Sequence, residues 1–452
     1  MSKFENDLST GNVWKQMLKF SFPFVIANII QVLYNVADMI IVGQFSGTAS
    51  MSGVNIGGQI TLVVTNLAIG LCVGATVLIA QYLGAKQRQE LETTIGTLFS
   101  TLIIVAIILM TSIIAFKKPI LRLMQTPEEA FSEASSYLTI TMLGTVFIFG
   151  YNALGAIMRG MGDSKNPMIF VAISCVTNIF ADLLLVAGFH MGAMGAALAT
   201  VFSQAISMLL CIRYLSNNDF VFTFSKENLK INKEKLKLLL KLGIPSSIQN
   251  VVVGMSFLFL IAMANSLGLA ESAAVGAVGK FNGFAIMPAI AISASVSAMS
   301  AQNIGAKEMG RAVKTLKVGF VLAAVMTFVM FLFAWFFPAT ILRAFVNDAA
   351  VISEGSKYLR AHSLDYLLVP FVFCFNGLFI GAGHTLFSMI NAMISSIIVR
   401  IPAAYILGFK TGLGITGIGL GAPLATVLSL FCSIIFFLSG RWKKPVISHL
   451  HN

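Results

Sequence analysis

The chain contains twelve apolar blocks, each long enough to cross a lipid bilayer as a helix. Spanning the hydrocarbon core takes about 20 mostly apolar residues. The blocks show no alternation of apolar and polar residues, which favours helices over the strands of a membrane barrel. A helix is also stable in lipid because it satisfies its own backbone hydrogen bonds. The predicted spans are residues 14–42, 51–82, 92–116, 129–158, 166–189, 192–215, 237–265, 272–302, 312–337, 354–380, 386–409 and 413–440.

Charged residues are too few to cover the surface of a soluble protein of this size. They make up 11% of the 452 residues, whereas hydrophobic residues make up 57%. A soluble domain has about 25% charged residues. This composition excludes a soluble enzyme, and the net charge of +12 does not indicate nucleic-acid binding. We predict an all-α integral membrane protein with lipid as its partner.

Lysine and arginine are unevenly distributed between the two sides of the predicted bundle. Twenty-one of the thirty basic residues fall on the side of the termini and seven on the opposite side. Positively charged loops remain in the cytoplasm, so we place both termini there, in a multi-pass protein. The basic segment 226–241 joins the two halves in the interpretation that we favour, and binding of anionic lipid headgroups is the alternative.

The sequence repeats itself at an offset of 221–222 residues. Ala80-Gln-Tyr-Leu-Gly-Ala-Lys86 returns as Ala301-Gln-Asn-Ile-Gly-Ala-Lys307, and Gly160-Met-Gly162 returns as Gly381-Ala-Gly383. Each copy holds six spans, so the halves share one membrane orientation and are related by a pseudo-twofold axis. This architecture places a substrate site between the halves and exposes it to alternating sides. The predicted parts are an N-lobe at 1–215, a cytoplasmic linker at 216–236 and a C-lobe at 237–452.

Two of the eighteen acidic residues lie well inside predicted spans. Asp38 shares a helix face with Gln31 and Tyr34, and Asp182 shares one with Asn178. An ionisable residue inside the membrane is costly and indicates a functional site. A carboxyl group in a low dielectric favours its protonated form unless a cation or hydrogen-bond donors stabilise the charge. The pattern predicts a site for a proton or a sodium ion, with a structural polar cluster as the alternative.

The acidic residues are not repeated in the second half. At an offset of 221, Asn178 and Asp182 meet Val399 and Ala403. We therefore expect the first half to couple an ion to transport and the second half mainly to complete the cavity.

The second half instead carries two basic residues inside predicted spans, Lys280 and Arg400. Each could line the cavity, pair with Asp365 or extend to the membrane surface. The depth of Lys280 in its span favours the cavity for that residue. For Arg400 the alternatives remain open.

No motif of a metal or nucleotide enzyme is present. The five cysteines and five histidines show no metal-ligand spacing. Gly412-Leu-Gly-Ile-Thr-Gly417 matches the dinucleotide pattern GxGxxG but lacks the surrounding strand–turn–helix unit. A membrane transferase would need clustered cytoplasmic acids or histidines. We predict that the protein is not an enzyme and uses no cofactor other than a coupling ion, H+ or Na+.

Several motifs occur together in a fixed order along the chain. They include Gln31-Val-Leu-Tyr34-Asn-Val-Ala-Asp38, Asn178-Ile-Phe-Ala-Asp182 and Gly195-Ala-Ala-Leu-Ala-Thr200. In this respect the chain resembles the MATE (multidrug and toxic compound extrusion) family along essentially its whole length, most closely the prokaryotic DinF-like branch. The resemblance implies a V-shaped fold of two six-helix bundles in a bacterial or archaeal cytoplasmic membrane. It also implies efflux of amphipathic, often cationic compounds in exchange for an ion, and we expect a monomer.

The resemblance also implies roles for individual residues. Ion coupling is implied for Asp38, Asn178, Asp182 and Thr200, and the first three would be the metal ligands if the ion is sodium. Membership of the surrounding polar network or cavity is implied for Gln31, Tyr34 and Tyr137, and bending of the first helix for Pro23.

One branch of the family differs from this chain in its second half. The NorM-like branch has acidic residues in helices 7 and 10, whereas the seventh span here offers only Gln249 and Asn250. We therefore do not predict a sodium site in the C-lobe. Within the same superfamily, export of lipid-linked precursors or metabolites is the alternative function.

Overall fold

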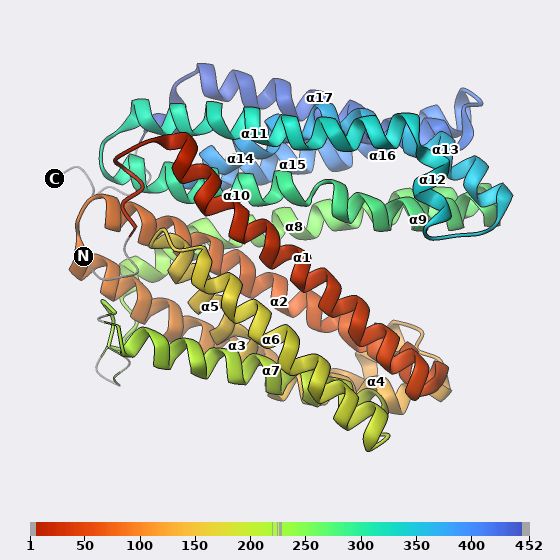
Figure 1. Cartoon of the computed structure of the whole chain (residues 1–452), viewed down its shortest axis with the longest axis horizontal. Coiled ribbons are helices and arrows are strands. Elements are labelled where there is room, and N and C mark those ends of the chain that lie inside the picture. The colour runs from red at the N-terminus through yellow and green to blue at the C-terminus, as the bar shows by residue number, and fades with distance from the viewer. Residues whose placement is uncertain (1–5, 219, 224, 226–227, 445–452) are drawn as a thin grey trace. The chain divides into compact units, whose positions relative to one another are not determined.

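The computed structural model describes residues 6–218, 220–223, 225 and 228–444. Its regular structure is helical, and the described residues form no strand. Figure 1 shows the elements in chain order. The first half contains α1 (Val13–Phe45), α2 (Gly47–Gly84), α3 (Arg88–Leu123), α4 (Glu128–Leu143), α5 (Thr145–Gly160), α6 (Lys165–Asp182), the π-helix η1 (Leu183–Gly188) and α7 (Gly192–Ser216).

The second half follows the same order with more interruptions. It contains α8 (Lys233–Leu267), α9 (Leu269–Ala285), α10 (Met287–Gly305), α11 (Met309–Phe336), α12 (Pro338–Arg343), α13 (Ala349–Ser363), the 3-10 helix η2 (Leu364–Leu367), α14 (Val369–Gly381), α15 (Thr385–Met393), the π-helix η3 (Ile394–Arg400), α16 (Ile401–Tyr405), the π-helix η4 (Ile406–Lys410), α17 (Gly414–Leu438) and the 3-10 helix η5 (Arg441–Lys443).

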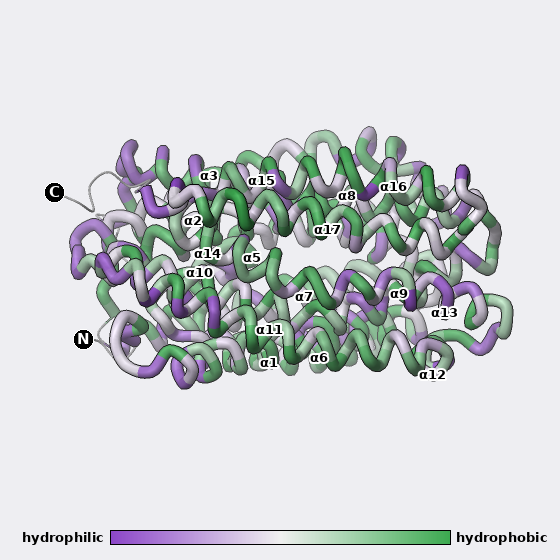
Figure 2. The backbone as a smooth tube through the Cα atoms, turned by 90° about the horizontal axis from the view of Figure 1, so that it is seen from above, coloured by the Kyte–Doolittle hydropathy of each residue, from purple (hydrophilic) through white to green (hydrophobic). Residues whose placement is uncertain are grey.

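The twelve predicted spans are confirmed. Ten helices in the described chain are long and apolar enough to cross a membrane, and two bent pairs bring the number to twelve. The pairs are α4 with α5, bent by 53°, and α13–η2 with α14, bent by 44°. Figure 2 shows apolar residues along the helices and polar residues gathered toward their ends and loops, as expected where lipid covers the middle of each helix.

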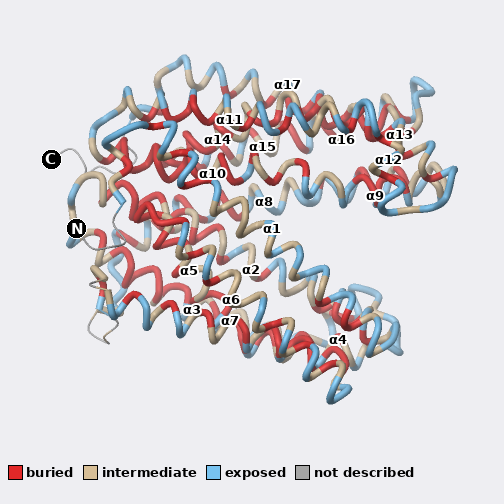
Figure 3. The backbone as a smooth tube through the Cα atoms, viewed as in Figure 1, coloured by how far each residue is buried: buried red, intermediate tan, exposed pale blue. Residues whose placement is uncertain are grey.

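The helices pack into two compact units. The N unit comprises Met1–Asp7 and Phe22–Ser247, and the C unit comprises Leu8–Ser21 and Ile248–Asn452. The chain therefore passes from one unit to the other inside α1, just before Pro23, and inside α8, just after Pro245. Figure 3 shows buried residues along the inner faces of the helices of each unit. The predicted linker, 216–236, lies partly outside the described residues.

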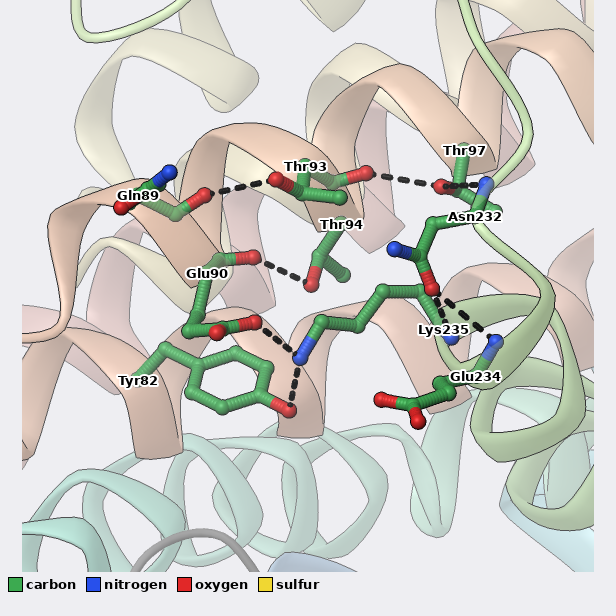
Figure 4. A network of polar contacts seen from close by, with 9 residues as sticks. All are labelled: Tyr82, Gln89, Glu90, Thr93, Thr94, Thr97, Asn232, Glu234 and Lys235. Carbon is green, nitrogen blue, oxygen red and sulfur yellow. Dashed lines mark hydrogen bonds and ion pairs between the residues drawn. The ribbon is translucent and has the colours of Figure 1, made fainter.

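The beginning of α8 is fastened to α2 and α3 in the N unit (Figure 4). Lys235 is only 2% exposed and forms an ion pair with Glu90. Its ammonium group also donates to the Tyr82 hydroxyl at 2.6 Å and lies 4.2 Å from the centre of that ring. Asn232, which precedes the helix, accepts from the backbone N–H of Lys235 at 3.1 Å and donates its own N–H to Thr97. These contacts explain why the first turns of α8 belong to the N unit.

The beginning of α1 is fastened to the C unit by Arg311, which occupies in the second repeat the position of Glu90 in the first. Arg311, in α11, lies 221 residues after Glu90. Its guanidinium donates to the carbonyl oxygens of Leu8, Thr10 and Gly11 and to Gln16 Oε1, at 2.6–3.2 Å. In both repeats, a charged residue in the same helical position therefore fixes the start of a long helix that continues into the other unit.

We expect Glu90→Gln to destabilise the protein more than Lys235→Met. Glu90→Gln leaves a buried ammonium group without its counter-ion, which costs about 2 kcal/mol after allowance for the partial exposure of Glu90. Lys235→Met removes the buried charge and leaves Glu90 close to solvent. The thermal unfolding midpoints of the purified variants in detergent test whether Glu90→Gln is less stable than Lys235→Met. Exposed Lys237→Met is the matched control, and equal midpoints for all three variants would contradict the role given to the ion pair.

Candidate ion-coupling site

The predicted ion-coupling residues come from three helices of the N unit. Asp38 lies in α1, Asn178 and Asp182 lie in the last two turns of α6, and Thr200 lies in α7. Asn178 and Asp182 are fully buried, and Asp38 and Thr200 are 9% exposed. The structure thus brings together residues that are up to 162 positions apart in the sequence.

The amide of Asn178 connects α6 to α7. With its nitrogen directed toward Asp182, it donates to Asp182 Oδ2 at 2.8 Å, and its oxygen accepts from the backbone N–H of Thr200 at 3.3 Å. The opposite orientation would place the amide oxygen against the carboxylate oxygen and leave both without donors. Asn178 therefore holds Asp182 in position from within the same helix.

The carboxyl groups of Asp38 and Asp182 lie within hydrogen-bonding distance of each other. Oδ1 of each carboxyl group is buried and has no hydrogen-bond partner. Two ionised carboxylates have no donor between them and repel each other strongly in a low dielectric. A proton or a cation between the two groups would relieve this repulsion, so the pair is a candidate site for a positive ion.

Two tyrosines and a threonine border the carboxyl pair. The hydroxyl groups of Tyr34 and Thr200 lie 3.3 Å apart, which links α1 to α7 above the acids. Tyr137, in α4, is 7% exposed and packs against Gly57 of α2, where a Cβ would lie only 2.7 Å from its ring. The absence of a side chain at Gly57 therefore allows Tyr137 to reach the site.

Gln31 lies apart from the carboxyl pair. It is exposed and lines two small cavities of the N unit, of about 70 and 30 Å³. The larger cavity also contains Arg159, in the last turn of α5, whose guanidinium lies 5.6 Å from the ring of Phe24. Arg159 lies one residue beyond the predicted fourth span, 129–158, whereas α5 continues to Gly160.

The two basic residues of the second half have different environments. Arg400 is 8% exposed at the end of η3 and lines a cavity of the C unit. Lys280 is exposed on α9 and does not line that cavity. Pro23 lies inside α1, two residues after the point where the helix enters the N unit.

The side chains at the site offer oxygen atoms of the kind that a proton or a sodium ion would bind. Hard cations prefer carboxylate, amide and hydroxyl oxygens. The carboxyl groups of Asp38 and Asp182 and the hydroxyl of Thr200 are such ligands. The amide nitrogen of Asn178 faces Asp182, so Asn178 would have to rotate its amide before its oxygen could bind a sodium ion.

Twelve apolar spans in two repeated halves, with two buried acids brought together in the first half, define a polytopic α-helical membrane transporter. The MatE family model matches the chain twice, at residues 23–184 and 245–406. The chain therefore belongs to the MatE family, and the two matches confirm the internal duplication.

Individual relatives cover nearly the full length of the chain. The probable multidrug resistance protein YoeA of Bacillus subtilis (strain 168) is 30% identical over 449 residues, covering 98% of this chain and 97% of the relative. The probable multidrug resistance protein NorM of Thermotoga maritima is 26% identical and covers 99% and 97%. The solved structure of a MOP superfamily transporter from Pyrococcus furiosus has the same fold, with a TM-score of 0.90, 23% identity and coverage of 98% and 100%.

The two family matches also show a second offset between the repeats. They are displaced by 222 residues at both ends, and the offset changes from 221 at Gly162 and Gly383 to 222 at Gly192 and Gly414. The π-helix η3 lies between these positions in the second half, and a π turn accommodates one additional residue in a helix. At the offset of 222, Asn178 aligns with Arg400, the last residue of η3, whereas at the offset of 221 it aligns with Val399.

Proposed function

We propose that the protein exports amphipathic, often cationic drug-like compounds in exchange for protons or sodium ions bound at Asp38 and Asp182. The contact between these two buried carboxyl groups carries the proposal. Protonation or sodium binding neutralises the pair, and loss of the ion leaves two adjacent negative charges that attract a cationic substrate. The names of the relatives YoeA and NorM, both probable multidrug resistance proteins, support drug-like compounds as substrates.

The exchange requires that the ion and the substrate compete for the ionised carboxyl pair of the N unit. A neutralised pair holds α1 and α6 together, since Asp38 and Asp182 belong to these two helices. Displacement of the ion by a cationic substrate would weaken that contact, and the substrate would leave when an ion returns from the other side. We place both termini in the cytoplasm and the protein, as a monomer, in the cell membrane, so the inward ion gradient drives outward transport.

Transport in proteoliposomes tests this function. Purified protein is reconstituted, and movement of ethidium, a cationic dye, is followed with a proton gradient or a sodium gradient imposed separately at the same membrane potential. One of the two gradients is expected to drive the dye against its concentration gradient, and the matching ionophore should abolish the movement. Dye movement that is equal with and without either gradient would contradict ion-coupled exchange.

A further inference from the structure

The C unit contains a cavity that has no part in the ion exchange proposed above. Its volume is about 160 Å³, and it lies among α8, α9, η2, α14, α15, η3 and α17. Four phenylalanine rings contribute to its wall, from Phe257, Phe373, Phe379 and Phe387. An engineered protein cavity of about 150 Å³ binds benzene, so a cavity of this size accommodates one aromatic ring with short substituents.

One positive group lines this cavity with unused hydrogen-bonding capacity. Arg400 donates to Ser256 Oγ at 2.9 Å, and its guanidinium lies 4.7 Å from the ring of Phe257. Its Nε is buried and has no partner. A guanidinium group offers five N–H donors in a planar fork that fits a carboxylate.

One acidic group lines the same cavity and is also incompletely paired. Asp365, in the 3-10 helix η2, is 7% exposed, and its Oδ1 has no hydrogen-bond partner. Although Asp365 and Arg400 share the cavity wall, they form no ion pair. His362, one turn before Asp365, stacks on Tyr358 and also has an unpaired nitrogen, Nδ1, while Asn391 and Ser388 each leave an oxygen without a partner.

Two opposite charges in one cavity, not paired with each other, restrict the ligand that fits. A buried charge is costly unless it is paired and hydrogen-bonded. An anionic ligand would satisfy Arg400 but would face Asp365, and a cationic ligand would have the reverse difficulty. A ligand that carries both charges satisfies both side chains at once.

We propose that the cavity between Arg400 and Asp365 binds a small zwitterion with an aromatic or apolar body. The carboxylate of the ligand pairs with Arg400, its ammonium group pairs with Asp365, and its ring packs among the phenylalanines. The π-helix η3 ends at Arg400, and π turns inside α-helices occur frequently at functional sites. At the offset of 222 the N unit has Asn178 at this position, so the two repeats differ in chemistry here.

Equilibrium binding to the native protein tests the ligand class with three matched compounds. Phenylglycine carries both charges, phenylacetate lacks the ammonium group, and benzylamine lacks the carboxylate. Isothermal titration calorimetry on purified protein, with no ion gradient present, gives the three affinities. We expect phenylglycine to bind at least tenfold more tightly than either analogue. Equal or tighter binding of an analogue, or no binding of any of the three up to about 10 mM, would overturn the proposal.

Substitutions separate the two charged contacts from a general loss of structure. Arg400→Gln and Asp365→Asn are each expected to weaken phenylglycine binding at least tenfold. The Asp365→Asn variant should bind phenylacetate more tightly than phenylglycine, and the Arg400→Gln variant should bind benzylamine more tightly than phenylglycine. Misfolding would not produce these changes of preference. Arg400→Lys keeps the charge and should retain part of the affinity.

Two further variants separate this site from the ion-coupling site. Lys280→Gln removes an exposed base of the same unit and should leave binding unchanged. Asp38→Asn should also bind phenylglycine normally, even where dye export fails. Loss of phenylglycine binding in either control would show that the compound does not bind between Arg400 and Asp365.

Discussion

Asp38→Asn and Asp182→Asn are each expected to abolish gradient-driven dye export while the protein remains folded. The two carboxyl groups are in contact with each other, and each change puts an amide in place of one of them. The amide can donate a hydrogen bond to the remaining acid. The pair then carries at most one negative charge, so loss of the ion no longer leaves the two adjacent negative charges on which the proposed exchange depends. The expected loss of ethidium export in proteoliposomes is at least tenfold for each variant.

The controls for this prediction concern charge and folding. Glu129→Gln removes an exposed carboxylate at the start of α4 and should export dye normally. The thermal unfolding midpoints of the two aspartate variants should equal or exceed that of the native protein, since one cause of charge repulsion is removed. Dye export within twofold of the native rate in both Asp38→Asn and Asp182→Asn would exclude the pair from coupling.

Gly160→Val and Gly381→Val are expected to cause the largest losses of stability. These glycines occupy equivalent positions in the two repeats, where α5 meets α2 and α14 meets α10. A Cβ would lie 2.9 Å from the Thr76 carbonyl oxygen at Gly160 and 2.5 Å from the Ser297 carbonyl oxygen at Gly381. Since both oxygens belong to helix backbone, the helices must separate, at a cost of about 3 kcal/mol per site.

The yield of monodisperse protein and the thermal unfolding midpoint in detergent measure this effect. Gly254→Val is the matched control, because it places the same side chain inside α8 with no neighbouring atom within 4 Å of the new Cβ. All three variants share the same change in intrinsic helix propensity from glycine to valine, so this change does not affect the comparison. Midpoints that are as high for Gly160→Val and Gly381→Val as for Gly254→Val would refute the close helix approach at these positions.

The membrane-spanning helices could be predicted from the sequence because lipid imposes length and composition on each helix separately. The bends could not be predicted. Gly144, between α4 and α5, and Leu368, between η2 and α14, lie inside blocks of continuous apolar sequence. The bend at each position depends on how neighbouring helices pack, which hydropathy does not report.

In the candidate site, too, the positions along one helix could be predicted from the sequence, whereas the contacts between helices could not. The spacing of Asn178 and Asp182 places them on one face of α6, and the sequence alone indicates this. Their contact with Asp38 joins two helices that are far apart in the chain, so only the fold reveals it.

The cavity of the C unit could not be predicted from the sequence either. Depth within a span favours Lys280 for the predicted cavity between the halves, which stays a prediction, whereas Arg400 lines the separate cavity of the C unit and Lys280 does not. Depth gives the position of a residue along the membrane normal, whereas the rotation of the helix decides which way its side chain points.

The central claim is that the Asp38–Asp182 pair binds an ion that the substrate displaces. Release of that ion on substrate binding tests it most directly. Ethidium is added to purified protein in weakly buffered solution, and protons are detected with a pH indicator and sodium with an ion-selective electrode. The native protein is predicted to release one of these ions on binding the dye, and the Asp38→Asn, Asp182→Asn double variant to release none. Equal release by both proteins, or no release by the native protein while it binds ethidium, would contradict the claim.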